Sequence, residues 1–146
     1  MAGEHGTGPD SAAIETDIEV EIDPSHFRFV LGHYPTGVCV ITGRRHEGAA
    51  TGLVVGSFTS VSLDPPLVAF FPDRKSSSWP QVRAGGYFCV NVLGEDQVDL
   101  CRQFAARGGD KFAGISHRVS DHELPLLDGV VAHIECAIAD EIDAGD

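Results

Sequence analysis

Residues 38–71 read VCVITGRRHEGAATGLVVGSFTSVSLDPPLVAFF, a series of short apolar runs separated by turn residues. Val38–Thr42 is apolar up to its threonine and predicts a buried strand. Arg44–Gly48 is polar and ends in glycine, which predicts a hairpin turn. Ala50–Val55 is then expected to return beside the first strand as its antiparallel partner.

The strand pattern continues on both sides of a proline break. In Gly56–Leu63, Ser and Thr alternate with apolar residues, and Asp64-Pro65-Pro66 interrupts the chain before Leu67–Phe71, which we expect to be a fully buried strand. Tyr87–Leu93 predicts another buried strand, and Val130–Ile142 shows the clearest alternation of apolar and polar residues. Six strands are therefore predicted.

Helices are expected only as short connections. Asp23-Pro24 predicts a helix start, and Pro35 ends that helix. Further helices are predicted from Ser76 to about Ala84 and over Gln97–Ala106, whereas residues 112–128 look irregular. Strands that are mostly joined by tight turns indicate a mainly β fold: a closed or nearly closed, Greek-key-like β-barrel of about six or more strands with a few short helices.

The length and composition of the chain indicate a single hydrophobic core, and its charge distribution limits the classes of partner that it can bind. The chain has 146 residues, of which 42% are hydrophobic, and a net charge of −12. Residues 1–23 hold seven acids and no Lys or Arg, while residues 24–139 hold eleven acids and ten bases. We therefore expect an acidic flexible arm over 1–22, a domain over 23–146, and no nucleic-acid partner.

No apolar run is long enough for a transmembrane helix, and the N-terminus lacks the features of a secretory signal, so we expect no membrane association and a cytoplasmic location. The four cysteines form no C-x-x-C pair and are expected to be reduced and mostly buried. The seven histidines are scattered, so no metal site is predicted, and His133 is expected to be solvated.

Three segments could carry binding chemistry. Gly52–Ser62 could bring main-chain groups close to a flat ligand, although a strand with a glycine bulge is the plainer interpretation. Asp73–Pro80 joins two bases and three serines at a helix start, which suits a phosphate about as well as it suits a capped surface helix. In Gly109–Phe112, Lys111 could reach a phosphate while Phe112 packs inward.

Several catalytic motifs are absent from the sequence, namely G-x-G-x-x-G after a strand, a Walker loop, a G-x-S-x-G elbow and H-E-x-x-H. If the protein is an enzyme, a bound cofactor is therefore expected to carry the chemistry.

The ordered set of segments resembles the flavin reductase-like family, whose fold is the FMN-binding split barrel. The matching segments are FRFVLGHYPTGVCVIT (27–42), GLVVGSFTSVSLDPPLVAF (52–70), KSSSWP (75–80), GGYFCVNVL (85–93), DLCRQFA (99–105), DKFAG (110–114), LLDG (126–129) and HIECAIADEIDAGD (133–146). The resemblance implies the reductase component of a two-component flavin-dependent monooxygenase. Such a component passes hydride from NADH or NADPH to FMN or FAD, works as a homodimer, and supplies reduced flavin to a separate oxygenase.

The resemblance also implies flavin-binding positions but no catalytic side chain. Thr36 would lie beside the isoalloxazine ring, and Lys111 and Phe112 would lie on the phosphate side. The other implied positions are Val54, Val55, Gly56 and Ser57 at the polar edge of the ring, Ser76, Ser77 and Ser78 at the phosphate, and Asn91, Val92 and Leu93 flanking the flavin.

The sequence departs from the family pattern in two places. Val54 and Gly56 stand where many members have hydroxyl or amide side chains, so binding would depend more on main-chain groups. Members also continue past the match to Asp146 with a histidine that contacts nicotinamide and with further strands, so we expect the sequence to be truncated. Alternative hypotheses are a non-catalytic flavin-binding module, a flavoenzyme that retains FMN and reduces an organic substrate, and a structural barrel.

Overall fold

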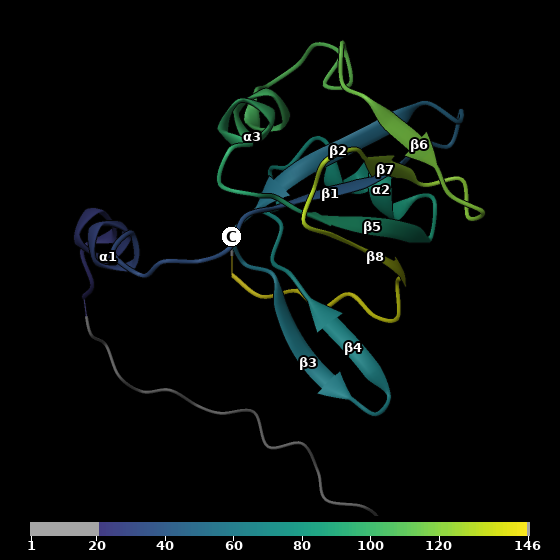
Figure 1. The fold of residues 1–146 in the computed structure, drawn as a ribbon. Helices are drawn as coiled ribbons and strands as arrows, with labels where there is room; N and C mark the ends of the chain where they lie inside the picture. Colours follow the sequence, from purple (N-terminus) through teal and green to yellow (C-terminus); the bar gives the residue numbers. More distant parts are fainter. Residues whose placement is uncertain (1–20, 146) are drawn as a thin grey trace, which may run out of the picture. The chain divides into compact units, whose positions relative to one another are not determined.

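The computed structural model describes residues 21–145, so the predicted acidic arm lies almost entirely outside the described residues (Figure 1). The chain divides into two units, Met1–Pro35 and Thr36–Asp146. Helix α1 (Pro24–Leu31) belongs to the first unit. Its start is the predicted one, because the Asp23 carboxylate accepts hydrogen bonds from the main-chain N–H groups of Ser25 and His26 at 3.1 and 3.2 Å.

The second unit is built on a four-stranded antiparallel sheet. Its strand order is β2-β1-β5-β8, with β1 at Cys39–Arg44, β2 at Ala50–Val55, β5 at Tyr87–Val92 and β8 at Ala132–Ala137 (Figure 1). Pairing of β1 with β2 runs without interruption from Cys39–Val55 to Arg44–Ala50. These four strands were predicted, and β2 forms one edge of the sheet.

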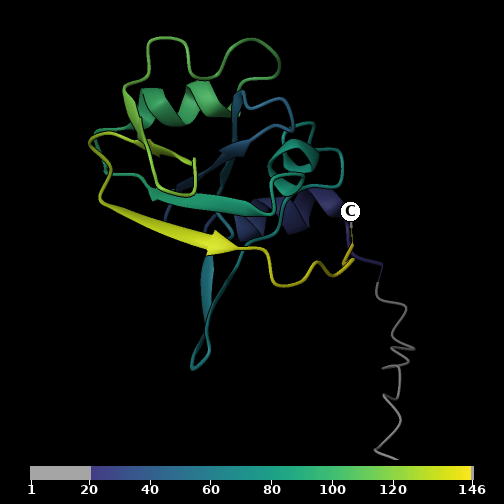
Figure 2. The same cartoon turned by 90° about the vertical axis from the view of Figure 1, so that its right-hand side faces the viewer.

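Two smaller sheets complete the described strands. The hairpin of β3 (Thr59–Leu63) and β4 (Pro66–Ala69) projects from the four-stranded sheet in both views (Figures 1 and 2). The other pair is β6 (His117–Val119) with β7 (Pro125–Leu127). The prediction of an irregular segment over 112–128 is therefore wrong for these two three-residue strands. The mainly β prediction is confirmed.

Burial of the segment Leu67–Phe71 also differs from the prediction. Its side chains lie in or next to a two-stranded hairpin rather than inside the larger sheet, so Leu67 and Phe71 remain 38% and 68% exposed. Phe70 alone turns inward among aromatic rings, with its centroid 5.2 Å from that of Trp79 and 5.3 Å from that of Phe88. The apolar run therefore predicted a strand correctly here, but the prediction that the strand is fully buried is wrong.

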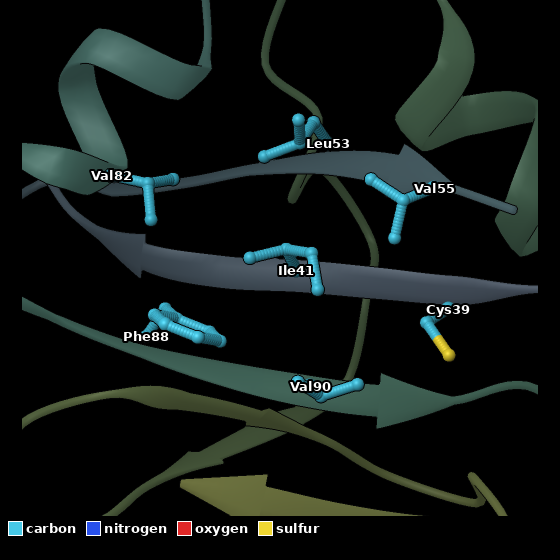
Figure 3. Close-up of a cluster of buried hydrophobic side chains, with 7 residues drawn as sticks. All are labelled: Cys39, Ile41, Leu53, Val55, Val82, Phe88 and Val90. Carbon is cyan, nitrogen blue, oxygen red and sulfur yellow. The ribbon is translucent and has the colours of Figure 1, made fainter. Parts of the chain in front are cut away.

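Apolar residues cover both faces of the four-stranded sheet. One face carries Ile41, Val90 and their neighbours together with Val82 from helix α2 (Trp79–Arg83) (Figure 3). The opposite face carries a cluster of Val40, Phe104 and Leu127, and Phe104 comes from helix α3 (Val98–Ala105). No helix within residues 21–145 combines the length and the apolar character needed to cross a membrane.

A buried polar network crosses the sheet at Asn91. Its side-chain amide donates to the carbonyl of Val40 at 3.0 Å and to the hydroxyl of Thr42 at 2.9 Å, and its oxygen accepts from the N–H of Leu127 at 2.8 Å. The Thr42 hydroxyl in turn donates to the carbonyl of Pro125 at 2.5 Å. Because every one of these groups is buried, the network fixes β7 against β1 and β5.

Candidate functional site

A polar pocket lies where the beginning of β2 meets the loop before α2 and the loop after α3. Its volume is about 130 Å³, and it is lined by Arg45, Ala50, Thr51, Ser77, Ser78, Gln81, Gly108, Gly109, Asp110 and Lys111. Segments that are far apart in the sequence thus contribute hydroxyl, amide and cationic groups to one small space. The sequence analysis singled out two of these segments, the serine run and the segment around Lys111.

The three consecutive serines have different roles. The Ser76 hydroxyl accepts a hydrogen bond from the N–H of Trp79 at 3.2 Å, so Ser76 caps α2 and does not line the pocket. Ser77 and Ser78 line the pocket, and Ser78 is only 7% exposed. The helix-start interpretation therefore fits Ser76, whereas Ser77 and Ser78 are the serines that a ligand in the pocket could reach.

Lys111 joins three parts of the fold. Its ammonium donates to the carbonyl of Gly52 at 3.2 Å, to the hydroxyl of Ser78 at 3.1 Å and to the carbonyl of Phe104 at 2.9 Å. Burial lowers the pKa of this ammonium below its ordinary value, because partial loss of water disfavours the charged form.

The loop that brings Lys111 to this place begins with two glycines in the left-handed region. Gly108 and Gly109 have φ of +74° and +71°, which other residues rarely adopt. Asp110 then closes the loop by accepting from the N–H of Phe112 at 2.9 Å. The Phe112 ring packs edge-on against Phe104, with centroids 5.1 Å apart, so the prediction that it packs inward is confirmed.

The sequence analysis missed the residues that brace the pocket. Gln81 donates to the carbonyl of Ser77 at 2.9 Å and accepts from the hydroxyl of Thr51 at 3.1 Å, which ties the serine loop to β2. Arg45 lines the pocket from a turn that was predicted correctly but given no role. The pairing of Arg44 with Ala50 at the end of the β1–β2 ladder places Arg45 next to the start of β2.

The candidate ring-binding residues gather at the other end of β2. Thr36 lies beside Gly56, where an added Cβ would come 3.1 Å from the Thr36 hydroxyl oxygen. The Ser57 hydroxyl accepts from the N–H of Phe71 at 2.8 Å, so it joins the segments before β3 and after β4 at the base of the hairpin. Val54 and Val55 point to opposite faces of the sheet and pack in the two different apolar clusters. The side chain of buried Val55 is therefore committed to the core.

Main-chain groups of β2 face outward at the sheet edge. The Gly52 carbonyl points away from β1, since it receives the Lys111 ammonium. Residues two apart in a strand direct their N–H and C=O groups to the same side, so the main-chain groups of Val54 also face this edge. From Thr51 to Val55 the strand runs about 13 Å, which joins the pocket to the candidate ring-binding end.

Gly52 has a packing role rather than a bulge. An added Cβ would lie 2.9 Å from both the Phe104 ring and the Ile41 carbonyl oxygen, and the ladder with β1 is regular here. The glycine therefore allows α3 to approach β2 closely.

The three residues proposed on β5 are enclosed by the sheet. Asn91 is fully buried and its amide is used by the polar network described above. The carbonyl of Val92 accepts from the N–H of Val131 at 2.8 Å, and the N–H of Leu93 donates to the carbonyl of Val38 at 3.0 Å. A flavin contact from this strand would therefore rest on the half-buried side chains of Val92 and Leu93.

His133 and the four cysteines lie outside the pocket. His133 is half-buried and its ring bonds the Leu127 carbonyl at 2.7 Å, so the prediction of a solvated histidine is wrong. All four cysteines are free, as expected, and Cys39 and Cys89 are buried. Burial raises the pKa of Cys89 to about 12, which keeps its thiol protonated and unreactive.

The residues present fit a phosphorylated planar ligand. A buried hydroxyl beside cationic groups suits a phosphate, and the free edge of β2 suits the donors and acceptors of a heteroaromatic ring. Both features lie along one strand within the second unit.

Comparison with known proteins identifies the family. Residues 31–146 match the model of the flavin reductase like domain family. A flavin reductase from Pseudomonas putida is 54% identical over 125 residues, which cover 86% of this chain and 74% of that protein.

Two crystal structures have similar folds. Nitrilotriacetate monooxygenase component B from Mycobacterium thermoresistibile has a TM-score of 0.80 and 48% identity, over 84% of this chain and 68% of that one. NADH:FAD oxidoreductase SgcE6 from Streptomyces globisporus, in complex with NAD and FAD fragments, has a TM-score of 0.79 and 36% identity, over 85% of this chain and 74% of that one. This chain therefore belongs to the flavin reductase-like domain family.

Proposed function

We propose that this protein is an NAD(P)H:flavin oxidoreductase that supplies reduced FMN or FAD to a separate monooxygenase. Membership of the family supports the reaction, and the nitrilotriacetate monooxygenase component supports the oxygenase partner. The NAD and FAD fragments bound to SgcE6 support flavin and nicotinamide nucleotides as the reactants. When bound, the flavin supplies the hydride acceptor.

The observation that carries the proposal is the continuity of the β2 edge with the polar pocket. Ser77 and Ser78 would hold the phosphate at one end of the strand, and the main chain of Val54, Gly56 and Ser57 would hold the polar edge of the ring at the other. Donor N–H groups fixed in a strand stabilise negative charge without having to reorganise.

The work of the protein is therefore to bind and orient. Thr36 and the segment Val54–Ser57 would fix the plane of the ring. We assign no side chain as acid or base, since hydride transfer between two stacked rings requires none.

We also propose a homodimer and a cytoplasmic location. The β3–β4 hairpin supports the dimer, because Val61 and Leu63 on it are 58% and 91% exposed and would be covered by a second copy. Four free cysteines support a reducing compartment. Light scattering of the purified protein tests the dimer directly.

Turnover with four substrate pairs tests the reductase proposal. The full chain is mixed with FMN or FAD and with NADH or NADPH, and loss of the nicotinamide absorbance is followed. We expect oxidation of at least one nicotinamide that depends on added flavin. Absence of turnover with all four pairs overturns the proposal; flavin fluorescence quenching would then select a non-catalytic binding module.

Paired serine variants connect the activity to the pocket. The double variant Ser77→Ala/Ser78→Ala should raise the KM for flavin about tenfold or more with a smaller change in kcat, because two hydroxyl donors to the phosphate are lost. Ser60→Ala/Ser62→Ala on β3 removes as many hydroxyls outside the pocket and should leave KM unchanged.

A protein that is yellow after gel filtration would instead favour a flavoenzyme with retained FMN.

A further inference from the structure

We infer that Arg45 supplies the positive charge for the flavin phosphate, and that Lys111 is a positioning residue that aims the Ser78 hydroxyl into the pocket. The inference rests on the proposed function, since it concerns the phosphate of the same flavin. It departs from the family resemblance, which implied Lys111 as the basic group at the phosphate.

Lys111 is committed to the protein itself. Its ammonium makes hydrogen bonds to the Gly52 carbonyl, the Ser78 hydroxyl and the Phe104 carbonyl, which is as many as an ammonium has N–H groups. A phosphate contact by Lys111 would have to break one of these bonds and leave a partly buried acceptor without its donor. Lys111 therefore acts on the ligand through its neighbours.

Ser78 is the neighbour that faces the pocket. Its hydroxyl oxygen accepts from the Lys111 ammonium at 3.1 Å, so its own proton is left to donate. Within residues 21–145 that proton has no protein acceptor, and Ser78 makes no side-chain cap to α2 although it stands at the N-cap position. A nearly buried donor of this kind, at the wall of a pocket, is available to a phosphate oxygen that enters the pocket.

Arg45 is the less committed cation at this pocket. Its carboxylate partner is Glu47 at 3.8 Å, and the two side chains are 42% and 73% exposed, so the pair is weak. The third charged residue of the lining, Asp110, accepts the N–H of Phe112 with one carboxylate oxygen and supplies no positive charge. A guanidinium can bind a phosphate through two parallel N–H groups, and it stays charged at all working pH values.

Binding of FMN and of riboflavin, which lacks the phosphate, separates these roles. Dissociation constants are measured by flavin fluorescence on the full chain, without nicotinamide. Wild type should bind FMN more tightly than riboflavin. Arg45→Gln should weaken FMN binding about tenfold and leave riboflavin binding unchanged, because only the charge contact with the phosphate is lost. Arg102→Gln, which removes an exposed arginine paired with Asp99 on α3, should change neither value.

A double-mutant cycle tests the positioning role. Lys111→Met and Ser78→Ala should each weaken FMN binding, and the double variant should be little worse than the worse single variant, because Lys111 acts through Ser78. Salt dependence gives a second readout. Raising the ionic strength should weaken FMN binding to wild type and should have less effect on Arg45→Gln.

Several outcomes would overturn the inference. Unchanged FMN binding in Arg45→Gln would exclude a contact between its charge and the phosphate. Effects of Lys111→Met and Ser78→Ala that add in the double variant would make Lys111 the phosphate's cation. Equal binding of FMN and riboflavin by wild type, with NADH oxidation retained, would overturn this inference and leave the proposed function intact. If Lys111→Met does not fold, Arg45→Gln and the riboflavin comparison still decide the question of charge.

Discussion

The two ends of β2 offer different kinds of groups to a ligand. At its beginning, side chains make the site: Ser78, Gln81 and Lys111 come from separate segments and are linked by hydrogen bonds. At its end, the side chains of Val54 and Val55 pack into the two apolar clusters, which leaves main-chain groups for a ligand.

Because of this difference, a side-chain substitution should have different consequences at the two ends of β2. Removal of one hydroxyl or one charge alters the pocket directly, whereas the outward groups of Val54 stay in place as long as β2 keeps its register with β1. Affinity for the phosphate should therefore respond to the identity of side chains, and affinity for the ring to the stability and position of the strand.

The largest expected effect comes from destabilising the four-stranded sheet, which contains both ends of β2. Asn91→Ala removes the amide that bonds Val40, Thr42 and Leu127 and leaves buried groups without partners. We expect a loss of about 3 kcal/mol in the free energy of unfolding. Urea denaturation followed by tryptophan fluorescence measures it.

Thr42→Val is the control for this variant, because it removes only the hydroxyl between Asn91 and the Pro125 carbonyl. Its loss should be smaller than that of Asn91→Ala. Equal stability of Asn91→Ala and wild type would show that the network does not hold the sheet together.

A smaller effect is expected from a substitution in the middle of β2, between its two ends. Gly52→Ala places a Cβ 2.9 Å from the Phe104 ring and the Ile41 carbonyl oxygen, so α3 or the strand must shift. We expect a loss of about 1–3 kcal/mol in unfolding free energy from overpacking. Gly37→Ala is the matched control, since no atom lies within 4 Å of its added Cβ, and it should cost little.

The contrast between the two ends is sharpened by two single truncations. Val54→Ala should cost about 1 kcal/mol of stability, because a half-buried side chain is shortened, and should change the KM for flavin less than about twofold. Ser78→Ala should do the reverse, with a clear rise in KM and a smaller loss of stability. A large rise in KM for Val54→Ala at unchanged stability would contradict main-chain binding.

The smallest effect concerns the outer side of α2. The Glu141 carboxylate accepts from the Trp79 indole N–H at 3.2 Å and from the Arg83 guanidinium at 3.0 Å, and these contacts hold its pKa below the ordinary value. A lowered folded-state pKa contributes stability above the unfolded-state pKa, and this contribution disappears as the pH falls through the folded-state value.

Wild type should therefore have a slightly higher Tm than Glu141→Gln near neutral pH, and the difference should vanish as the pH falls through the folded-state pKa of Glu141. Thermal unfolding of both proteins across this range measures it. A difference that persists in acid would show that packing, rather than charge, holds Glu141 against α2.

Strand positions were predictable from the sequence where apolar and polar residues alternated over a long enough segment, or where turn residues marked the end of a strand. Ala50–Val55 matches β2 residue for residue, and the turn before it was placed correctly. His117–Val119 and Pro125–Leu127 are three residues long, which is too short to show a period. Burial was less predictable, because Leu67–Phe71 has the composition of a core strand but joins only a hairpin.

The site was predictable as segments but not as contacts. The serine run and Lys111 could be selected by residue type, yet the partners of Lys111 come from Gly52, Ser78 and Phe104, whose proximity only the fold reveals. For the same reason Gln81 went unnoticed, since a glutamine on a short helix carries no signal until its partners are known.

The outward edge of β2 also has a consequence for sequence drift. If the ring is recognised by peptide groups, residues such as Val54 are free to vary in evolution as long as they still pack and pair. Proteins with this kind of site would then share little side-chain identity at the very positions that touch the ring. Their kinship would be more visible in the shape of the backbone than in any short motif.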